Sequence, residues 1–214
     1  MKLYGYFRSS AAFRVRIALN LKGLAYEQAF IHLRKNDQRS AEYLALNPQG
    51  LVPTLVDDNG TVLTQSLAIM EYLEETRPMP PLLPPDPAGR ARVRSLAEAI
   101  ACDIHPIDNL RVLQFLSRQF GHKDPEIETW FNHWIALGFE GIEKTLASDG
   151  KAGRFAHGDT PGIADICLVP QVFNARRYPS FDFTPYPSIM RVFDNCMKLD
   201  AFDRAVPEKQ PDAE

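Results

Sequence analysis

The chain has 214 residues with a formal net charge of −3 at pH 7, and 45% of its residues are hydrophobic. This length suffices for one large domain or two small ones, and the composition supports a packed core. The charge is mixed and no basic tract occurs, which argues against nucleic-acid binding. No apolar run reaches ~18 residues, which argues against a membrane span.

The three cysteines, Cys102, Cys167 and Cys196, lie far apart in helix-like contexts. Their odd number and spacing argue against disulfides and predict a reducing, cytoplasmic setting. The chain begins directly with a strand pattern rather than with a cleavable apolar leader. The histidines lack the paired spacing of metal ligands, so no metal is expected.

The first junction between a strand and a helix carries two serines. Residues 2–7 have the composition of a short strand, and apolar residues at helical spacing follow from 10 to 21, where Lys22-Gly23 ends the helix. Arg8-Ser9-Ser10 therefore lies at a helix entrance, where free N–H groups and the helix dipole favour an anion. A serine hydroxyl there can donate to a thiolate, phosphate or carboxylate, and simple N-capping is the alternative role.

The pattern continues as an α/β unit. The next predicted elements are a strand at 26–31, a short helix at 40–46, strands at 52–56 and 61–64, and a helix from 66 to about 76. A strand, helix and strand within about 31 residues form a βαβ unit, and Asn59-Gly60 is a strong hairpin signal. The order favours a mixed four-stranded sheet with helices on its faces.

A proline-rich segment separates this unit from a helical remainder. The prolines are Pro78, Pro80, Pro81, Pro84, Pro85 and Pro87. They predict a stiff linker, and a proline-rich ligand is disfavoured because Leu82 and Leu83 are expected to be buried. We therefore predict a first domain at 1–80, a linker at 81–87 and an all-helical domain at 88–214, with a loose polar tail from residue 207.

The helical part carries several further expectations. A break in the helical spacing is expected at Pro106, and a long helix at 125–146 would bury Trp130, Trp134, Leu137 and Ile142. Another buried helix is predicted at 162–176, with Gly162 as its N-cap and Asp165 at position N3.

Two motifs in the first unit could bind a peptide. If the bond between Val52 and Pro53 is cis, the backbone of Val52 faces outward and can pair with an extended peptide; an ordinary proline at a strand start is the alternative. Gln65-Ser66 lies at a second helix entrance and suits an α-carboxylate, whereas capping alone would explain only Ser66. Glu71 and Glu74 on the same helix are expected on a solvated face.

Arginines lie near several predicted helix ends. Arg8, Arg111 and Arg176-Arg177 would each serve there as dipole partners or in surface ion pairs. If several converge, they would instead bind a small dicarboxylate through bidentate contacts.

The first helix entrance reads Ser9-Ser10-Ala11-Ala12-Phe13-Arg14-Val15-Arg16-Ile17-Ala18-Leu19. This stretch resembles the signature of the zeta-class glutathione transferases, the maleylacetoacetate isomerases. The resemblance continues through residues 47–55 and 65–75 and into the helical half, so it spans nearly the whole chain. The bacterial glutathione-dependent maleylpyruvate isomerases are also similar. The resemblance implies a thioredoxin-like domain of order βαβαββα followed by an all-helical glutathione-transferase domain, usually as a homodimer.

The resemblance also implies site residues. Ser9 would stabilise the glutathione thiolate, with Ser10 and Arg8 beside it. The other positions that match glutathione contacts of the family are Ser10, Gln38, Val52, Gln65, Ser66, His105, Asn109 and Arg111. Arg8, Arg111 and Arg177 match positions that face an acidic substrate, and Arg177 matches better than Arg176.

The sequence departs from the family at several places. Alanine stands at Ala11 instead of the usual cysteine and at Ala12 instead of a serine, and Phe13 replaces a tryptophan. Leu51 replaces a frequent glutamine and Gly162 a frequent threonine.

The implied activity is cis–trans isomerisation of maleylacetoacetate or maleylpyruvate, with glutathione as the regenerated cofactor. One alternative is a glutathione transferase that conjugates or dehalogenates small electrophiles. Another is a non-catalytic binding module on the same fold. The joint presence of Ser9, Val52-Pro53 and Gln65-Ser66 argues against the binding module, and the arginines favour the isomerase over the transferase.

Overall fold

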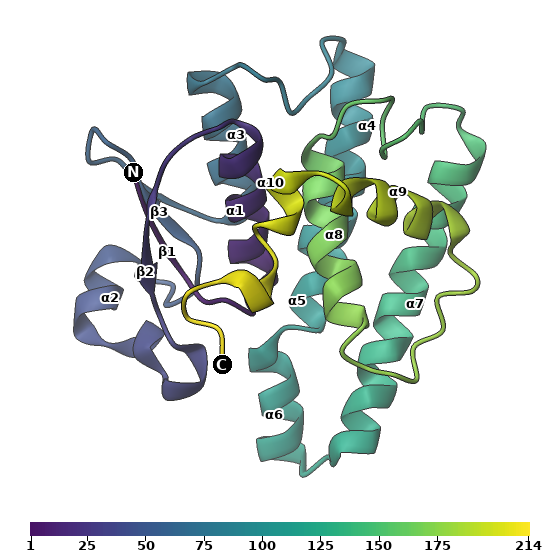
Figure 1. Ribbon diagram of the computed structural model, residues 1–214. Coiled ribbons are helices and arrows are strands. Elements are labelled where there is room, and N and C mark those ends of the chain that lie inside the picture. The colour runs from purple at the N-terminus through teal and green to yellow at the C-terminus, as the bar shows by residue number, and fades with distance from the viewer. The chain divides into compact units, whose positions relative to one another are not determined.

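The computed structural model describes all 214 residues, which divide into two compact units (Figure 1). The first comprises Met1–Leu82 together with Met197–Glu214, and the second comprises Leu83–Cys196. The last eighteen or so residues thus belong with the first unit, whereas the sequence placed them in the helical domain. The prediction of a loose tail is wrong, because Gln210 is only 6% exposed and its side-chain amide donates to the carbonyls of Arg204 and Val206 at 2.9 and 2.8 Å.

The first unit contains the sheet and the helices that cover it. Its elements are β1 (Lys2–Gly5), α1 (Ser10–Leu21), β2 (Glu27–Phe30), the short 3₁₀ turns η1 (Leu33–Lys35) and η2 (Asp37–Arg39), α2 (Ala41–Leu46), β3 (Thr54–Val56), β4 (Val62–Thr64), α3 (Ser66–Thr76), α10 (Asp200–Asp203) and η4 (Pro207–Lys209).

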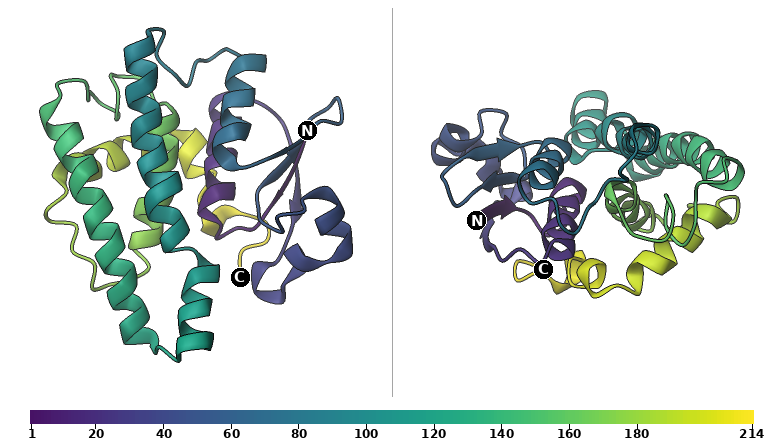
Figure 2. Two further views of the ribbon diagram at one scale, coloured as in Figure 1. Left: turned by 180° about the vertical axis from the view of Figure 1, so that it is seen from behind. Right: turned by 90° about the horizontal axis from the view of Figure 1, so that it is seen from above.

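The four strands lie in the order β2-β1-β3-β4. β1 runs parallel to β2 and antiparallel to β3, and β3 pairs antiparallel with β4 so that Thr54 faces Thr64. This confirms the predicted βαβ unit, the hairpin and the mixed sheet. In both views of Figure 2, α1 and α3 lie on one face of the sheet and α2 lies on the other.

Helix α1 is buried on nearly every side because it packs between the sheet, α3 and α10. Its end is held by Lys22, whose ammonium contacts the Glu74 carboxylate at 2.8 Å and the carbonyls of Arg77 and Pro80. The same carboxylate accepts the amide of Leu82 at 3.0 Å. The expectation that Glu74 is solvated is therefore wrong: it is 7% exposed because it satisfies a buried cation and a turn of the proline-rich segment.

The second unit is helical. Its elements are α4 (Pro87–Glu98), the π-helical segment η3 (Ala99–Ile104), α5 (His105–Ile107), α6 (Leu110–Phe120), α7 (Asp124–Ser148), α8 (Ile163–Ala175) and α9 (Pro187–Met197), which ends at the first residue of the other unit's C-terminal segment. The predicted break at Pro106 is displaced: the helical run continues through Pro106 in α5, is interrupted at Asp108 and Asn109, and resumes with α6.

The buried stripe of α7 is Phe131, Ile135, Phe139, Ile142 and Leu146. Of the expected core residues, Ile142 is buried, Trp130 and Trp134 are half-buried, and Leu137 is 54% exposed. The prediction for Leu137 is wrong because the stripe follows the Phe and Ile residues rather than the tryptophans.

Helix α8 is buried almost throughout, and its start confirms the predicted cap. One oxygen of the Asp165 carboxylate accepts from the Gly162 amide and the other from the Ala156 amide, each at 2.8 Å. Burial raises the pKa of Asp165 to about 6 although these backbone bonds oppose the shift.

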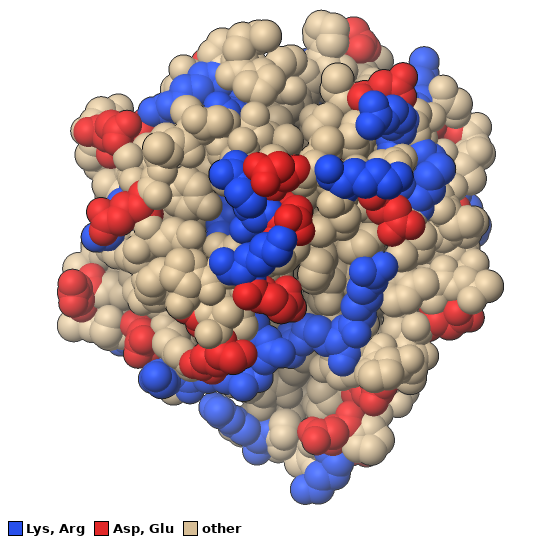
Figure 3. Space-filling model, viewed as in Figure 1, with Lys and Arg blue, Asp and Glu red and all other residues tan.

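None of the helices combines the length and the apolar character that crossing a bilayer requires. Positive and negative side chains are interspersed on the face shown in Figure 3, as the mixed composition suggests.

Candidate active site

The turn before α1 presents Ser9 at the helix entrance. The Ser9 amide donates to the Tyr6 carbonyl at 2.9 Å, and its hydroxyl oxygen accepts from the Ala12 amide at 3.2 Å. Ser9 is thus the N-cap of α1, as one of the two interpretations held. This cap uses a lone pair of the hydroxyl and leaves its hydrogen available to donate to an anion. The capping role and the anion-binding role are therefore compatible.

The neighbours of Ser9 add charge and dipole. The side chain of Arg8 is exposed, with its guanidinium 5.7 Å from the ring centroid of Phe7. Ser10 is nearly buried in the first turn of α1. The free N–H groups of that turn give this end of the helix a partial positive charge.

The turn before β3 leaves one peptide unit open. The bond between Val52 and Pro53 is cis, and neither the amide nor the carbonyl of Val52 hydrogen-bonds within the chain. The carbonyl of Leu51 is held by the Tyr43 hydroxyl at 2.7 Å and by the Asn47 amide at 2.8 Å. The fold fixes the turn on one side and leaves the backbone of Val52 available to an extended ligand.

The entrance of α3 has an unusual backbone. Gln65 adopts φ +67°, a left-handed conformation that is uncommon for residues other than glycine and often marks a functional site. Its exposed side chain contacts that of Gln49 at 2.8 Å. The hydroxyl of the buried Ser66 accepts from the guanidinium of Arg14 at 3.2 Å, so its own hydrogen can donate outward.

Gln38 lies in the η2 turn. Its side-chain oxygen is buried without a hydrogen-bond partner. The turn lies close to Gly50, where an added Cβ would come within 2.9 Å of the Gln38 carbonyl. Gln38 is therefore next to the Leu51-Val52 turn.

The first unit thus brings together the predicted residues at one end of its sheet. Arg14 joins the entrances of α1 and α3 through Ser66, and the pairing of β3 with β4 places Val52-Pro53 beside Gln65. Sequence analysis missed the supporting residues Arg14, Tyr43 and Asn47. A charged residue on the apolar side of a predicted helix was the available signal for Arg14.

The second unit holds the remaining predicted residues around the junction of α5 and α6. Asn109 is the N-cap of α6, and its side-chain oxygen accepts from the Arg111 amide at 3.2 Å. His105 is half-buried at the start of α5, and Arg111 is exposed. The indole of Trp130 on α7 donates to the Ile107 carbonyl at 3.2 Å and fixes this junction.

Asp108 lies in the same junction and was not predicted as a site residue. It is 3% exposed, and neither oxygen of its carboxyl has a hydrogen-bond partner. Burial raises its pKa to about 8, so the carboxyl is neutral at pH 7. Burial raises the pKa of the Tyr178 phenol, and the charge of Arg177 opposes this shift.

The end of α8 separates the two adjacent arginines. Arg176 stacks on the ring of Phe193, with its guanidinium carbon 4.2 Å from the centroid. Arg177 is exposed and donates to the side chain of Asn174 at 3.2 Å. Both arginines are exposed, so the two differ in their contacts, an aromatic ring for Arg176 and a side-chain amide for Arg177.

Comparison with known proteins identifies both units. The family described as Glutathione S-transferase, N-terminal domain, matches residues 8–76, and the family described as Glutathione S-transferase, C-terminal domain, matches residues 128–195. The chain is 52% identical over 213 residues to a maleylpyruvate isomerase of Ralstonia sp, and the match covers 100% of both chains.

Two solved structures are similar over the full length. The holo structure of maleyl pyruvate isomerase, a bacterial glutathione S-transferase in Zeta class, matches with a TM-score of 0.97 at 51% identity and covers 100% of both chains. The maleylacetoacetate isomerase from Methylobacterium extorquens AM1 with bound malonate and glutathione matches with a TM-score of 0.96 at 45% identity, again over 100% of both chains.

Proposed function

Because the chain belongs to the glutathione S-transferase family, in its zeta class of maleylpyruvate and maleylacetoacetate isomerases, we propose that it is a glutathione-dependent cis–trans isomerase of maleylacetoacetate or maleylpyruvate. The observation that carries the proposal is the position of Ser9, whose hydroxyl caps α1 through its oxygen and keeps its hydrogen for an anion.

The residues of the first unit fit glutathione. The unbonded amide and carbonyl of Val52 suit the backbone of a tripeptide, which would pair with them as a short strand. Gln65 and Ser66 at the entrance of α3 suit the α-carboxylate of its γ-glutamyl end. Ser10 and Gln38 would add contacts, as would His105, Asn109 and Arg111 of the second unit.

Ser9 would hold the sulfur. When bound, glutathione supplies a thiol nucleophile for reversible addition to the cis double bond, which can rotate while it is single. The hydroxyl of Ser9 donates to the sulfur and the dipole of α1 favours its anionic form, so both lower the pKa of a thiol from about 8.5. Arg8 lies next to this position and adds positive charge.

The arginines would hold the substrate. Both candidate substrates carry carboxylates, and Arg8, Arg111 and Arg177 are exposed side chains that can form bidentate contacts with them. Fixed positive charge also stabilises the negative charge that develops on the substrate carbonyl during addition. A relative that binds malonate, a small dicarboxylate, together with glutathione supports this role.

We further propose that the enzyme acts as a cytoplasmic homodimer in the breakdown of aromatic compounds. Maleylacetoacetate would place it in tyrosine degradation and maleylpyruvate in gentisate degradation. The genes next to its own would distinguish the two routes.

The test is an ultraviolet assay of the purified protein with maleylacetone or maleylpyruvate, with and without glutathione. We expect isomerisation only with glutathione. The same preparation is offered chlorodinitrobenzene and 2-haloacids, and faster turnover of these compounds would favour a conjugating or dehalogenating transferase. Failure to bind immobilised glutathione would favour a non-catalytic module.

A further inference from the structure

The amide and the carbonyl of Phe7 are held by two side chains, one from the C-terminal residues and one from α1. The Phe7 amide donates to the carboxylate of Asp212 at 2.9 Å. The Phe7 carbonyl accepts from the guanidinium of Arg16 at 3.0 Å. Both polar backbone groups of Phe7, which lies two residues before Ser9, are therefore satisfied by side chains.

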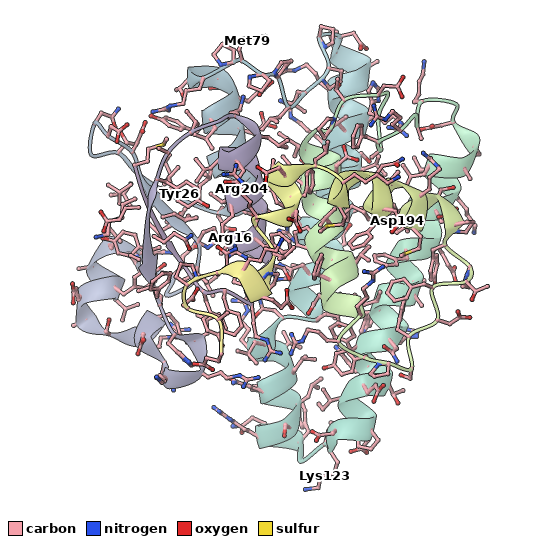
Figure 4. The ribbon with its side chains drawn as sticks, viewed as in Figure 1. Arg16, Tyr26, Met79, Lys123, Asp194 and Arg204 are labelled. Atoms are coloured by element: carbon pink, nitrogen blue, oxygen red, sulfur yellow. The ribbon has the colours of Figure 1, made fainter.

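Arg16 also joins this turn to the C-terminal segment, residues 200–214. Its Nε donates to the Ala205 carbonyl at 3.0 Å, and the side chain is 2% exposed. Burial lowers the pKa of Arg16 to about 10, which leaves it charged at neutral pH. Figure 4 shows Arg16 beside this segment, to which the labelled Arg204 belongs.

The C-terminal segment is anchored along its length to the first unit. The side chain of Asn20 on α1 donates to the Ala201 carbonyl at 2.9 Å. The side chain of Gln28 on β2 contacts that of Gln210 at 3.3 Å, and His32 contacts the Glu214 carboxylate at 2.5 Å. Because residues on both sides of Asp212 are bonded to the first unit, the Asp212 carboxylate is held in position to accept from the Phe7 amide.

The bonds to Phe7 also fix the position of Ser9, because the two residues belong to the same short turn. Arg8 and Ser9 follow Phe7 directly, and the Ser9 amide closes the turn on Tyr6. Groups that contact a reacting atom act well only when they are held within about 0.5 Å of their productive positions. A turn with a freed Phe7 amide would lose one of the bonds that define where the hydroxyl of Ser9 lies.

We propose that Asp212 is a positioning residue of the active site: through the Phe7 amide, the C-terminal segment fixes Arg8 and the hydroxyl of Ser9 at the entrance of α1. The inference rests on the proposed function for its effect on turnover, but the effect on the backbone is independent of it. It assigns a role to a segment that lies outside both matched family domains.

Amide hydrogen exchange tests the backbone effect directly. In Asp212→Ala, we expect the peptide that contains Phe7, Arg8 and Ser9 to exchange at least tenfold faster than in the wild type. Asp212→Asn keeps an oxygen acceptor and should restore slow exchange. Glu208→Gln is the matched control, because this exposed residue of the same segment makes no contact with the turn.

Kinetics with glutathione test the consequence for the site. We expect Asp212→Ala to lower kcat about tenfold, with a smaller change in KM for the acidic substrate, and to raise the pKa of the bound thiol as followed by thiolate absorbance. Asp212→Asn should recover most of the activity, and Glu208→Gln should behave as the wild type. Thermal unfolding of each variant separates these effects from loss of fold.

The outcomes test the positioning role of Asp212 and the proposed function separately. Unchanged exchange at residues 7–9 in Asp212→Ala overturns the positioning role, as does faster exchange with unaltered kcat and thiol pKa. If the wild type neither binds glutathione nor isomerises either substrate, the proposed function fails, and the exchange experiment still decides whether Asp212 holds the turn.

Discussion

The two units treat their candidate site residues differently. In the first unit, Ser9 and Ser66 already accept hydrogen bonds from the chain, and the turn at Leu51 is fixed by Tyr43 and Asn47. In the second unit, the carboxyl of Asp108 is buried without a hydrogen bond. Each unit holds a buried oxygen without a partner, on Gln38 in the first and on Asp108 in the second. The units differ in that the serines and the Leu51 turn of the first are held by hydrogen bonds before a ligand binds, whereas Arg111 and Arg177 of the second are exposed.

This contrast suggests a division of labour. A site whose groups are held before the ligand arrives loses little conformational entropy on binding. Exposed side chains such as Arg111 and Arg177 can instead adapt to acids of different length. The predictions below test each side of the contrast, from the largest expected effect to the smallest.

Replacement of Ser9 by alanine should have the largest effect on activity. Removing a single hydrogen-bond donor to a reacting anion commonly lowers kcat by about 10²–10³, or ~2.7–4 kcal/mol. Steady-state kinetics with saturating glutathione measure this loss. Ser9→Thr keeps the hydroxyl and the cap and serves as the control. Full activity of Ser9→Ala would contradict the role of this residue.

Asp165→Ala should destabilise the second unit without changing its chemistry. The substitution leaves the amides of the buried Ala156 and the half-buried Gly162 without their acceptor. Each such group costs about 1–3 kcal/mol, so we expect a loss of about 3 kcal/mol in unfolding free energy. Urea denaturation measures it. Asp159→Ala, which removes a bond to the Arg154 amide in an exposed loop, is the comparison and should cost less.

Asp108→Asn should change how stability depends on pH. The pKa of this carboxyl is about 8 in the folded chain and near its ordinary 3.8 when unfolded. Between these values the folded state binds more protons than the unfolded state, so stability falls as the pH rises, by at most ~1.4 kcal/mol per pH unit.

The asparagine cannot take up this proton, so the stability of the variant should not fall with pH in this way. The free energy of unfolding of the variant should therefore rise relative to that of the wild type by up to about 2.7 kcal/mol from pH 5 to pH 7. Urea denaturation at both pH values measures it. The exposed Asp103 on the same segment supplies the control, as Asp103→Asn should leave the pH dependence unchanged. Equal slopes for Asp108→Asn and the wild type would show that the carboxyl ionises normally.

Much of this molecule follows from local sequence. The alternation of strand and helix patterns, Asn59-Gly60 and the proline-rich segment were enough to predict the sheet and the helical unit. Contacts between distant residues were not predictable, because no local pattern reports them. Asp212 accepts from the Phe7 amide across a separation of 205 residues, and Glu74 is buried because it pairs with Lys22 at the end of another helix.

The same distinction applies to the site. Ser9, Val52-Pro53 and Gln65-Ser66 lie at element boundaries that the sequence marks, and the structure brings them to one end of the first unit. Asp108 looked like an ordinary residue of a polar junction. Its burial to 3% exposure depends on the folded chain around the junction, where the indole of Trp130 on α7 holds the adjacent Ile107 carbonyl.

Gly50→Ala tests, with the smallest effect, how tightly the first unit's framework is built. Gly50 has φ +60°, and an added Cβ would come within 2.9 Å of both the Gln38 carbonyl and the Arg39 guanidinium. The left-handed conformation alone costs an alanine about 1–2 kcal/mol, and the carbonyl cannot move as a flexible side chain can. We expect a loss of about 2 kcal/mol in stability together with weaker glutathione binding, since Gln38 and the Leu51-Val52 turn would shift apart. Denaturation and calorimetric titration measure the two effects.

Gly60→Ala is the matched control, because Gly60 has φ +83° but no neighbour near its Cβ position. This variant should lose stability and keep its affinity for glutathione. Equal affinities for Gly50→Ala and Gly60→Ala would show that the turn tolerates displacement and that the framework is looser than the bonds around Leu51 suggest.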